Sequence, residues 1–144
     1  MKLLCINQSR DRVSHKWLQQ WLRAVPVLLK RPKLAKKELV VVFVDSGEMK
    51  RLNNLYRQKN YATDVLSFEA AEESCVGELV ICLPVVRAQS KRTGLSTRGE
   101  LGYMIVHGVL HLLGHDHEEP AKEAKMFALQ DKLYGELERK IGLR

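Results

Sequence analysis

The sequence predicts an α+β domain in which a small, mixed, four-stranded sheet is covered by about five helices. The chain has 144 residues, a usual length for one domain, so residues 1–144 are expected to form a single domain. Short runs rich in Val, Ile and Leu are interspersed with longer segments whose apolar residues recur at helical spacing. The expected order is strand, helix, strand, helix, two strands and then helices, which favours the α+β class.

The first quarter of the chain is predicted to form one strand and one amphipathic helix. The strand covers Lys2–Asn7. Ser14 suits the N-cap of a helix over residues 15–29, because its side chain can accept a hydrogen bond from a backbone N–H of the first turn. Pro26 is expected to end or kink this helix. The basic residues 30–37 are expected to form a loop.

The middle of the chain is predicted to supply the other three strands and two helices. Residues 38–44 run through Leu, Val and Phe without polar alternation, which is typical of a central strand. Asp45 or Ser46 can cap the helix that follows, and Pro84 suits the first turn of another. The expected ranges are strand 38–44, a helix to Tyr56, loop 57–63, strands 65–68 and 78–83 joined by a polar turn ending at Gly77, and helix 84–92.

Two helices are expected to complete the fold. Thr97 starts a long helix that ends near Gly114, since glycine readily adopts the left-handed conformation that stops a helix. Pro120 starts the last helix, which reaches about Ile141. Its apolar stripe is predicted to comprise Met126, Leu129, Leu133, Leu137 and Ile141.

Positive charge is concentrated near the N-terminus. The formal net charge is +7, yet residues 1–39 alone carry ten Lys or Arg residues against two acidic ones, a net charge of +8. Such a region attracts polyanions such as RNA. A solvated face that only aids solubility is an equally good interpretation of the charge by itself.

No membrane segment is expected, and the cysteines indicate a cytoplasmic protein. The longest apolar run, residues 39–44, is far shorter than the ~20 residues that a spanning helix needs. The apolar stretch at the start of the sequence is too short for a signal peptide. Cys5, Cys75 and Cys82 are odd in number and contain no C-x-x-C pair, so reduced, buried thiols without a metal are expected.

A cluster of histidines predicts a metal site at the end of the long helix. His107 and His111 stand at i, i+4, so both rings project from one helix face. Gly114 can turn the chain so that His117 approaches the same point. Three imidazoles leave an open position on a tetrahedral metal, which is typical of catalytic zinc. We expect one zinc ion per chain, although copper, nickel or iron also bind imidazole and the spacing of the first pair alone can arise by coincidence.

The residue after the first histidine separates two classes of hydrolase. The spacing H-x-x-x-H-x-x-G-x-x-H matches the ligand pattern of the metzincin peptidases. Zinc peptidases carry a Glu general base at the position of Gly108. Three neutral imidazoles also leave the full charge on the metal, which suits an anionic phosphodiester. This combination favours a nuclease over a peptidase.

Several residues near the histidines have more than one interpretation. Asp116 can act as an acid or base, can orient a ligand imidazole, or can cap the turn; we favour the orienting role. His115 faces either solvent or substrate. Glu118 and Glu119 are expected to stabilise the N-terminus of the last helix by their negative charge rather than to take part in catalysis.

Three sequence blocks, over residues 52–68, 77–82 and 107–117, resemble the motifs of a known family, the YbeY rRNA maturation endoribonucleases. The stretch HGVLHLLGHDH over residues 107–117 is similar to the family signature H-G-x-L-H-L-x-G-[YH]-D-H. The segments LNNLYR (residues 52–57) and TDVLSF (residues 63–68) resemble the block N-x-x-y-R followed by T-D-V-L-S-F. Residues 77–82 resemble its G-D-I-x-I strand. The resemblance covers roughly residues 40–135, so the basic N-terminal quarter lies outside it.

The resemblance implies a set of functional residues and partners. It assigns the zinc ligands to His107, His111 and His117, and an important arginine to Arg57, whose guanidinium is suited to bidentate phosphate binding. It implies a cytoplasmic, single-strand-specific endoribonuclease that matures the 3′ end of the small-subunit (16S) rRNA and acts in ribosome quality control. Its partners would be rRNA, the ribosomal small subunit and assembly factors. This chain departs from the family motifs at three positions. It has Glu69 where the family usually has proline, Glu78 where the family usually has Asp, and His115 where tyrosine is commoner.

Two other functions stay open on sequence alone. A zinc peptidase or amidase would need a carboxylate base from elsewhere, such as Asp116 or Glu118. A non-catalytic ribosome-assembly factor would hold a structural zinc, and such a site is closed by a fourth protein ligand.

Overall fold

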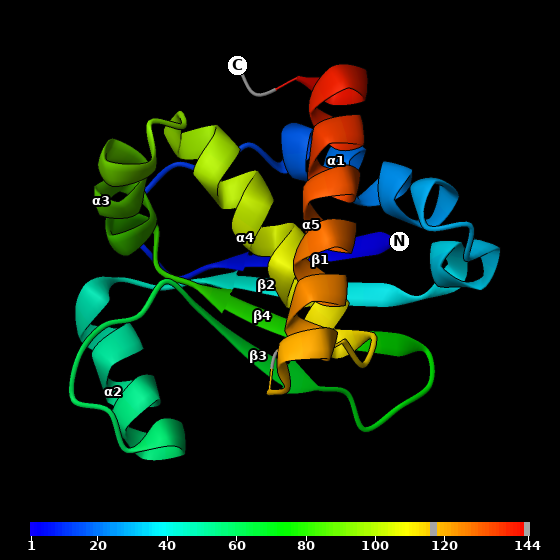
Figure 1. Cartoon of the computed structure of the whole chain (residues 1–144). Helices are drawn as coiled ribbons and strands as arrows, with labels where there is room; N and C mark the ends of the chain where they lie inside the picture. The colour runs from blue at the N-terminus through cyan, green and yellow to red at the C-terminus, as the bar shows by residue number, and fades with distance from the viewer. Residues whose placement is uncertain (116–117, 143–144) are drawn as a thin grey trace.

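The computed structural model describes residues 1–115 and 118–142, and their elements follow the predicted α+β order (Figure 1). Five α-helices and a short 3-10 helix surround a four-stranded sheet in this part of the chain. The elements are β1 (Lys2–Asn7), α1 (His15–Leu28), η1 (Pro32–Lys36), β2 (Glu38–Phe43), α2 (Ser46–Arg57), β3 (Val65–Glu69), β4 (Cys75–Ile81), α3 (Leu83–Thr93), α4 (Thr97–Leu112) and α5 (Pro120–Ile141).

The sheet has the strand order β1-β2-β4-β3. The strands β1, β2 and β4 are parallel, and β3 pairs antiparallel with β4, so the sheet is mixed as predicted. The apolar strand β2 occupies an interior position, which confirms the prediction from its unbroken Val-rich run. No helix among the described residues is long and apolar enough to cross a membrane.

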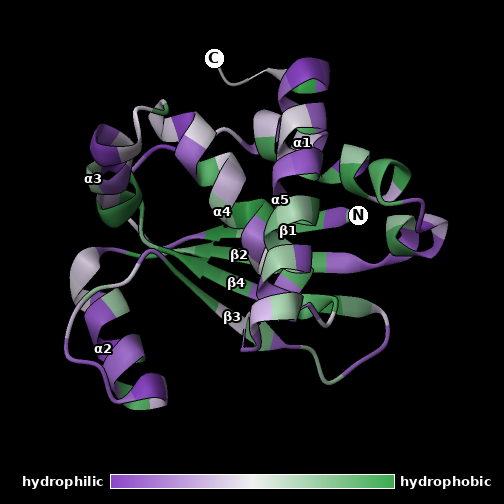
Figure 2. Ribbon diagram, in the orientation of Figure 1, coloured by the Kyte–Doolittle hydropathy of each residue, from purple (hydrophilic) through white to green (hydrophobic). Residues whose placement is uncertain are grey.

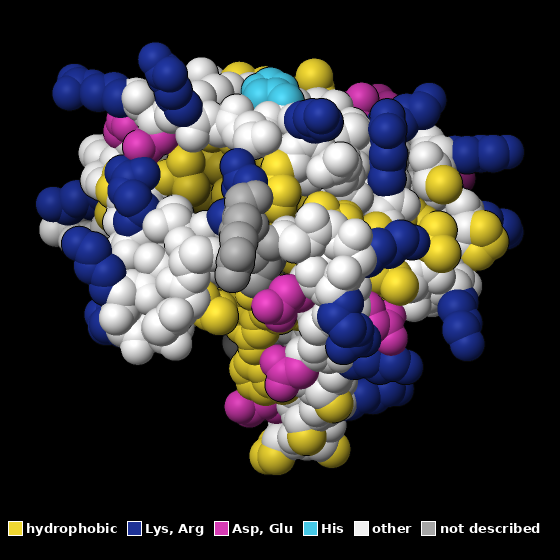
Figure 3. Space-filling view, turned by 90° about the horizontal axis from the view of Figure 1, so that it is seen from above, with side chains coloured by type: hydrophobic (Ala, Val, Ile, Leu, Met, Phe, Trp, Pro, Cys, Tyr) yellow, Lys and Arg dark blue, Asp and Glu magenta, His cyan; other side chains and the backbone are white. Residues whose placement is uncertain are grey.

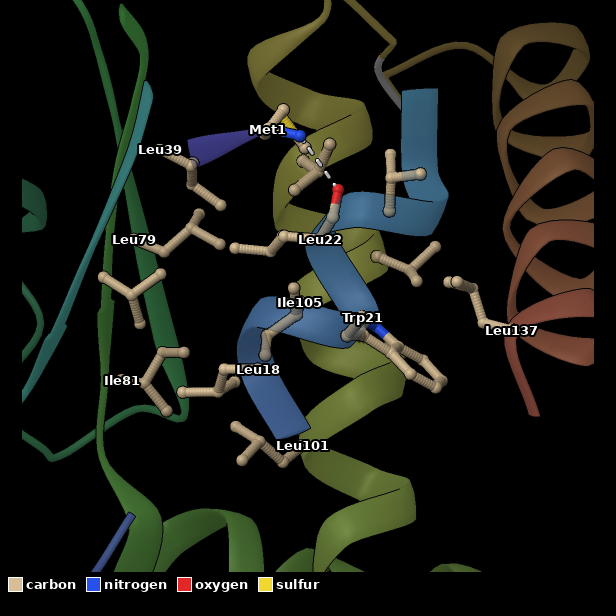
Figure 4. Packing of buried hydrophobic residues seen from close by; sticks show 14 of the residues in the cluster. Met1, Leu18, Trp21, Leu22, Leu39, Leu79, Ile81, Leu101, Ile105 and Leu137 are labelled. Carbon is tan, nitrogen blue, oxygen red and sulfur yellow. Dashed lines mark hydrogen bonds between the residues drawn. The ribbon is translucent and has the colours of Figure 1, made fainter. Parts of the chain in front are cut away.

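Helices α1 and α4 cover one face of the sheet, and α5 packs on the outer side of these two helices (Figure 4). Leu39, Leu79 and Ile81 point from the strands toward apolar side chains of α1 and α4 (Figure 4). The opposite face carries a smaller apolar cluster, in which Met49 of α2 packs with Val42. The hydrophobic strands lie in the interior, whereas the outer face of α2 is hydrophilic (Figure 2). Burial of α4 against the sheet therefore fixes the helix that carries the histidines.

Helix α1 continues through the proline that was expected to end or kink it. Ser14 caps the helix as predicted, and its side chain accepts a hydrogen bond from the backbone N–H of Trp17 at 3.2 Å. Pro26 lies inside the helix, which ends at Leu28. Because proline has no N–H, the carbonyl of Leu22 lacks its normal helical donor. The N-terminal ammonium group of Met1 donates to that carbonyl at 3.1 Å, so the helix loses no partner there (Figure 4).

Two connections differ from the prediction. Residues 30–37 were expected to be a loop, but they contain the 3-10 helix η1, which starts at Pro32 and buries Leu34 in the core. Gly77 was expected to end a turn, but it lies within β4. Its φ is +148°, and a Cβ there would lie 2.7 Å from the carbonyl oxygen of Phe68 and 2.6 Å from the side chain of Leu112. The glycine therefore lets the end of α4 approach the β3–β4 hairpin closely.

Smaller differences concern single side chains. Asp45 occupies the N-cap position of α2, but its side chain makes no capping bond and instead accepts from the backbone N–H of Arg10 at 3.1 Å. All three cysteines are free thiols, of which only Cys82 is buried as expected. Cys5 and Cys75 are half-buried because they lie on the edge strand β1 and at the start of β4.

Candidate functional site

The C-terminal half of α4 places two histidine rings side by side. His107 and His111 stand one turn apart, as their spacing predicts, with ring centroids 4.7 Å apart and an interplanar angle of 76°. Both side chains are half-buried and line one cavity of about 290 Å³. Gly114, with φ of +97°, follows the end of the helix at Leu112 and is exposed there.

Four parts of the chain wall this cavity, which is called the histidine cavity below. Arg57, at the end of α2, lines it together with His107 and His111, although sequence spacing gives no reason for this meeting. The guanidinium belongs to an exposed residue, so the cavity has one cationic, solvent-facing side. The remaining lining residues are Thr63, Asp64, Val65, Ser67, Tyr103, Met104, Phe127 and Gln130.

The loop that precedes β3 is held by Asp64. Its Oδ1 accepts hydrogen bonds from the hydroxyl of Thr63 at 3.1 Å and from the backbone N–H of Val65 at 2.8 Å. The backbone carbonyl of Asp64 also accepts from the N–H of Cys82 at 2.9 Å. These bonds give the T-D pair a structural role, and they fix one wall of the histidine cavity.

Helix α5 braces the histidine face of α4 through polar contacts. His107 Nδ1 lies 3.0 Å from Oε1 of Gln130, whose side chain is fully buried. The hydroxyl of Tyr103 donates to Oδ1 of Asp131 at 3.0 Å, and the Tyr103 ring packs edge-on against Tyr134. Burial, followed by the hydrogen bond to Asp131 and its charge, raises the pKa of Tyr103 to about 12. Tyr103 therefore stays protonated at neutral pH.

Sequence reasoning missed Gln130 as a site residue. The sequence did hold a signal, since Gln130 lies on the buried face of α5, with Met126 before it and Leu133 and Leu137 after it. A polar residue at an otherwise apolar helical spacing indicates a buried partner.

Gly108 faces the sheet rather than the histidine cavity. A Cβ at this position would lie 2.6 Å from Cδ2 of Leu79 on β4, and Gly108 itself is buried. A glutamate side chain has no room there while α4 packs on β4. The general base that zinc peptidases carry at this position is therefore excluded by packing as well as by sequence.

Two residues assigned from the sequence, Asp116 and His117, lie outside the described residues. Within residues 1–115 and 118–142, no group of three or more His, Cys, Asp or Glu residues is placed to hold a metal. The described pair of histidines does fit a shared metal. Two imidazoles on one tetrahedral zinc, each at a Zn–N distance of about 2.0–2.1 Å, have ring centroids roughly 5 Å apart. The 4.7 Å separation of His107 and His111 is close to that value.

His115 does not line the histidine cavity. It is half-buried and lines a second cavity of about 300 Å³, together with three cations, Lys30, Arg31 and Lys132, and one acidic residue, Glu136; this is called the basic cavity below. The apolar part of its lining consists of five leucines: Leu28, Leu29, Leu113, Leu129 and Leu133. His15, expected at the surface, is exposed.

Comparison with known proteins places the chain among endoribonucleases. The sequence model of the family described as Endoribonuclease YbeY matches residues 4–138. The chain belongs to the YbeY endoribonuclease family. An Endoribonuclease YbeY from Bdellovibrio bacteriovorus is 43% identical over 150 aligned positions that span all of both chains. Another from Pseudomonas putida is 40% identical and covers 81% of this chain and 78% of its own.

A solved structure shares the fold of this chain. The solution structure of a protein from Thermotoga maritima matches with a TM-score of 0.69 and 27% sequence identity. The match covers 96% of this chain and 90% of the other. The match of the family model extends well beyond the three motif blocks and includes most of the basic N-terminal quarter, where no motif was recognised.

Proposed function

We propose that this protein is a zinc-dependent endoribonuclease that cuts single-stranded RNA. The observation that carries the proposal is the histidine cavity, in which Arg57 joins His107 and His111 in a chain of the YbeY family. Membership of that family supports a hydrolase acting on RNA. The dependence on zinc, the strand specificity and the cellular role are the proposal.

The metal would be held by His107, His111 and His117. The ring geometry of the first two fits a shared zinc ion, and the contact of His107 Nδ1 with Gln130 leaves coordination by His107 to Nε2. When bound, zinc would supply positive charge and would lower the pKa of a water molecule, so that the water can lose a proton at neutral pH. Because all three ligands are neutral, little of that positive charge is cancelled, which suits an anionic substrate.

Arg57 would bind the phosphodiester beside the metal. Among the described residues, no acidic side chain forms an ion pair with Arg57. The carboxylate of Asp64 lines the same cavity but is engaged by Thr63 and by the backbone of Val65. The guanidinium is therefore available for two parallel hydrogen bonds to phosphate oxygens. Asp116 remains the candidate that orients a ligand imidazole or moves a proton.

The shape of the site favours a single strand over a duplex. The phosphodiester has to enter a cavity of about 290 Å³ that is walled by α2, β3, α4 and α5. A single strand can bend its backbone into such a cavity, whereas an A-form duplex holds its phosphates on a regular surface.

The basic cavity would hold a flanking part of the RNA. Three cations line it, Lys30, Arg31 and Lys132, against one acidic residue, Glu136, and the rest of its lining is mostly leucine. In the described part of the chain, none of these three cations forms an ion pair. Lys and Arg side chains also ring the face that Figure 3 shows, where acidic side chains are fewer. The cations of this arrangement can attract phosphates, and its apolar side chains can contact a nucleobase.

In the cell, the expected substrate is the 3′ end of the small-subunit (16S) rRNA. The family resemblance carries this part of the proposal, together with a cytoplasmic location, a role in ribosome quality control, and the ribosomal small subunit and assembly factors as partners.

The test is RNA cleavage by purified protein of known metal content. Wild type, His111→Ala and Arg57→Ala would be given one unstructured RNA and one duplex of the same length. We expect one zinc per chain in wild type, cleavage of the unstructured RNA, and strong loss in both variants. Equal cleavage by wild type and His111→Ala would reject the proposal. Peptide turnover without RNA cleavage would support a zinc peptidase instead, and bound zinc without either activity would support an assembly factor.

A further inference from the structure

Gln130 is a fully buried polar residue on the apolar face of α5. Its Oε1 lies 3.0 Å from His107 Nδ1, whereas its Nε2 is buried without a hydrogen-bond partner among the described residues. A buried amide N–H group without a partner costs free energy, so its retention at this position indicates a role other than stability. Within the described structure, the single side-chain hydrogen bond of Gln130 is to the first histidine of the histidine cavity.

A neutral imidazole carries one proton, and the partner of each ring nitrogen decides which nitrogen holds it. The amide oxygen of Gln130 can only accept a hydrogen bond. With Oε1 facing the ring, His107 must carry its proton on Nδ1, which leaves the lone pair on Nε2. If the amide turned over, its N–H would donate to Nδ1 and the ring proton would move to Nε2.

We propose that Gln130 is a positioning residue that holds His107 in the tautomer with a proton on Nδ1, so that Nε2 is ready to bind the metal. The inference rests on the proposed function, because it gives His107 the role of a metal ligand. Groups that orient a metal-binding imidazole in this way raise metal affinity without touching the metal.

The role of Gln130 is separable from packing of α5 on α4. Tyr103 joins the two helices independently, through its hydrogen bond to Asp131 and its ring contact with Tyr134. The other buried residues of α5 are Met126, Leu133, Leu137 and the aromatic Tyr134, so leucine at position 130 is compatible with this largely apolar face. Replacing the amide should therefore change the histidine more than it changes the helix interface.

The experiment compares Gln130→Leu, which removes the acceptor, with Gln130→Glu, which keeps an acceptor oxygen. Gln89→Leu is the matched control, since Gln89 is a half-buried glutamine of α3 that does not line the histidine cavity. The first readout is the ring protonation of His107 in metal-free protein, from long-range proton–nitrogen NMR spectra. The second is zinc affinity by competition with a chelator, and thermal melting of each metal-free variant verifies folding.

We expect wild type, Gln130→Glu and Gln89→Leu to keep the proton of His107 on Nδ1. Gln130→Leu should shift it to Nε2 and lower zinc affinity ~10–100-fold. A folded Gln130→Leu protein with wild-type tautomer and zinc affinity would overturn the inference, and so would loss of zinc affinity in a folded Gln130→Glu protein. If wild type bound no zinc, the proposed function would fail, yet the NMR spectra would still decide whether Gln130 sets the tautomer.

Discussion

The histidine cavity and the basic cavity are similar in volume, at about 290 and 300 Å³, but they are built differently. In the histidine cavity, His107 and Tyr103 each have a hydrogen-bond partner on α5. In the basic cavity, Lys30 and Arg31 extend from the end of α1 without an ion pair in the described structure. The first arrangement suits chemistry, which needs fixed geometry. The second suits attraction of a polyanion, which tolerates mobile charges.

The largest expected effect comes from removing a proposed metal ligand from the histidine cavity. We expect His111→Ala to reduce zinc affinity by more than the ~10–100-fold that removal of an orienting residue costs, and to abolish RNA cleavage. Metal analysis after dialysis and an RNA cleavage assay measure both effects. His15→Ala is the control, because His15 is exposed on α1. Unchanged zinc content in His111→Ala would contradict the assignment of the metal ligands.

Removal of Arg57 tests whether the cationic side of the histidine cavity takes part in the reaction. Arg57→Ala should lower kcat by about 10²–10³-fold, as loss of a group that stabilises transition-state charge does. Arg57→Lys should restore only part of the rate, because an ammonium group cannot form the bidentate bond to phosphate. Zinc content should stay that of wild type in both variants. A change in KM alone would show that Arg57 only binds substrate.

The buried side of α4 gives the third test, which concerns stability rather than chemistry. Gly108→Ala should destabilise the protein by about 1–3 kcal/mol, because the added methyl group overlaps Leu79 in a packed core. Gly135→Ala on α5 is the matched control, since the nearest atom to its added Cβ is Arg139 Nη1 at 3.8 Å. That change should stabilise the protein by roughly 0.5–1 kcal/mol. Denaturant unfolding of both metal-free variants measures the difference.

The cations of the basic cavity should contribute a smaller effect, visible mainly in salt dependence. We combine Lys30→Asn, which tolerates the φ of +55° at this position, with Arg31→Ala. Loss of two phosphate contacts should reduce the salt slope of single-strand RNA binding by about 1.4, with kcat unchanged. The control removes the same charge from α3, by Lys91→Ala with Arg92→Ala. Equal slopes in the two double variants would show that the basic cavity holds no RNA.

The smallest effect concerns the phenols that fix α4 to α5. The pKa of Tyr103 and that of Tyr134 are both raised from 10.0 to about 12, in each case mainly by burial. Because the folded protein favours the protonated phenols, this stabilisation is complete below pH 10 and is lost as the pH rises toward 12. Tyrosinate absorbance should show two phenols that titrate late. Tyr103→Phe should remove one of them and leave neutral-pH stability little changed.

Some functional features followed from local sequence patterns. The stop of α4 before Gly114 and the start of α5 at Pro120 depend on backbone preferences of single residues. The shared face of His107 and His111 follows from the helical repeat. The YbeY resemblance was also carried by contiguous blocks, and the match over residues 4–138 confirms it. The coordination of zinc by His107, His111 and His117, and the role of Asp116, stay predictions.

Other features arise only when distant elements meet. Pro26 is tolerated inside α1 because the ammonium group of Met1, which directly precedes β1, supplies the missing donor. Arg57 reaches the histidine cavity because α2 ends beside it, and Gln130 reaches His107 because α5 packs along α4.

The sequence by itself determined the α-helices and strands, their order and the pair of histidines, because helix and strand preferences act between residues a few positions apart. Tertiary packing decided which arginine and which glutamine share the histidine cavity, because those contacts depend on how whole helices and strands are placed against one another.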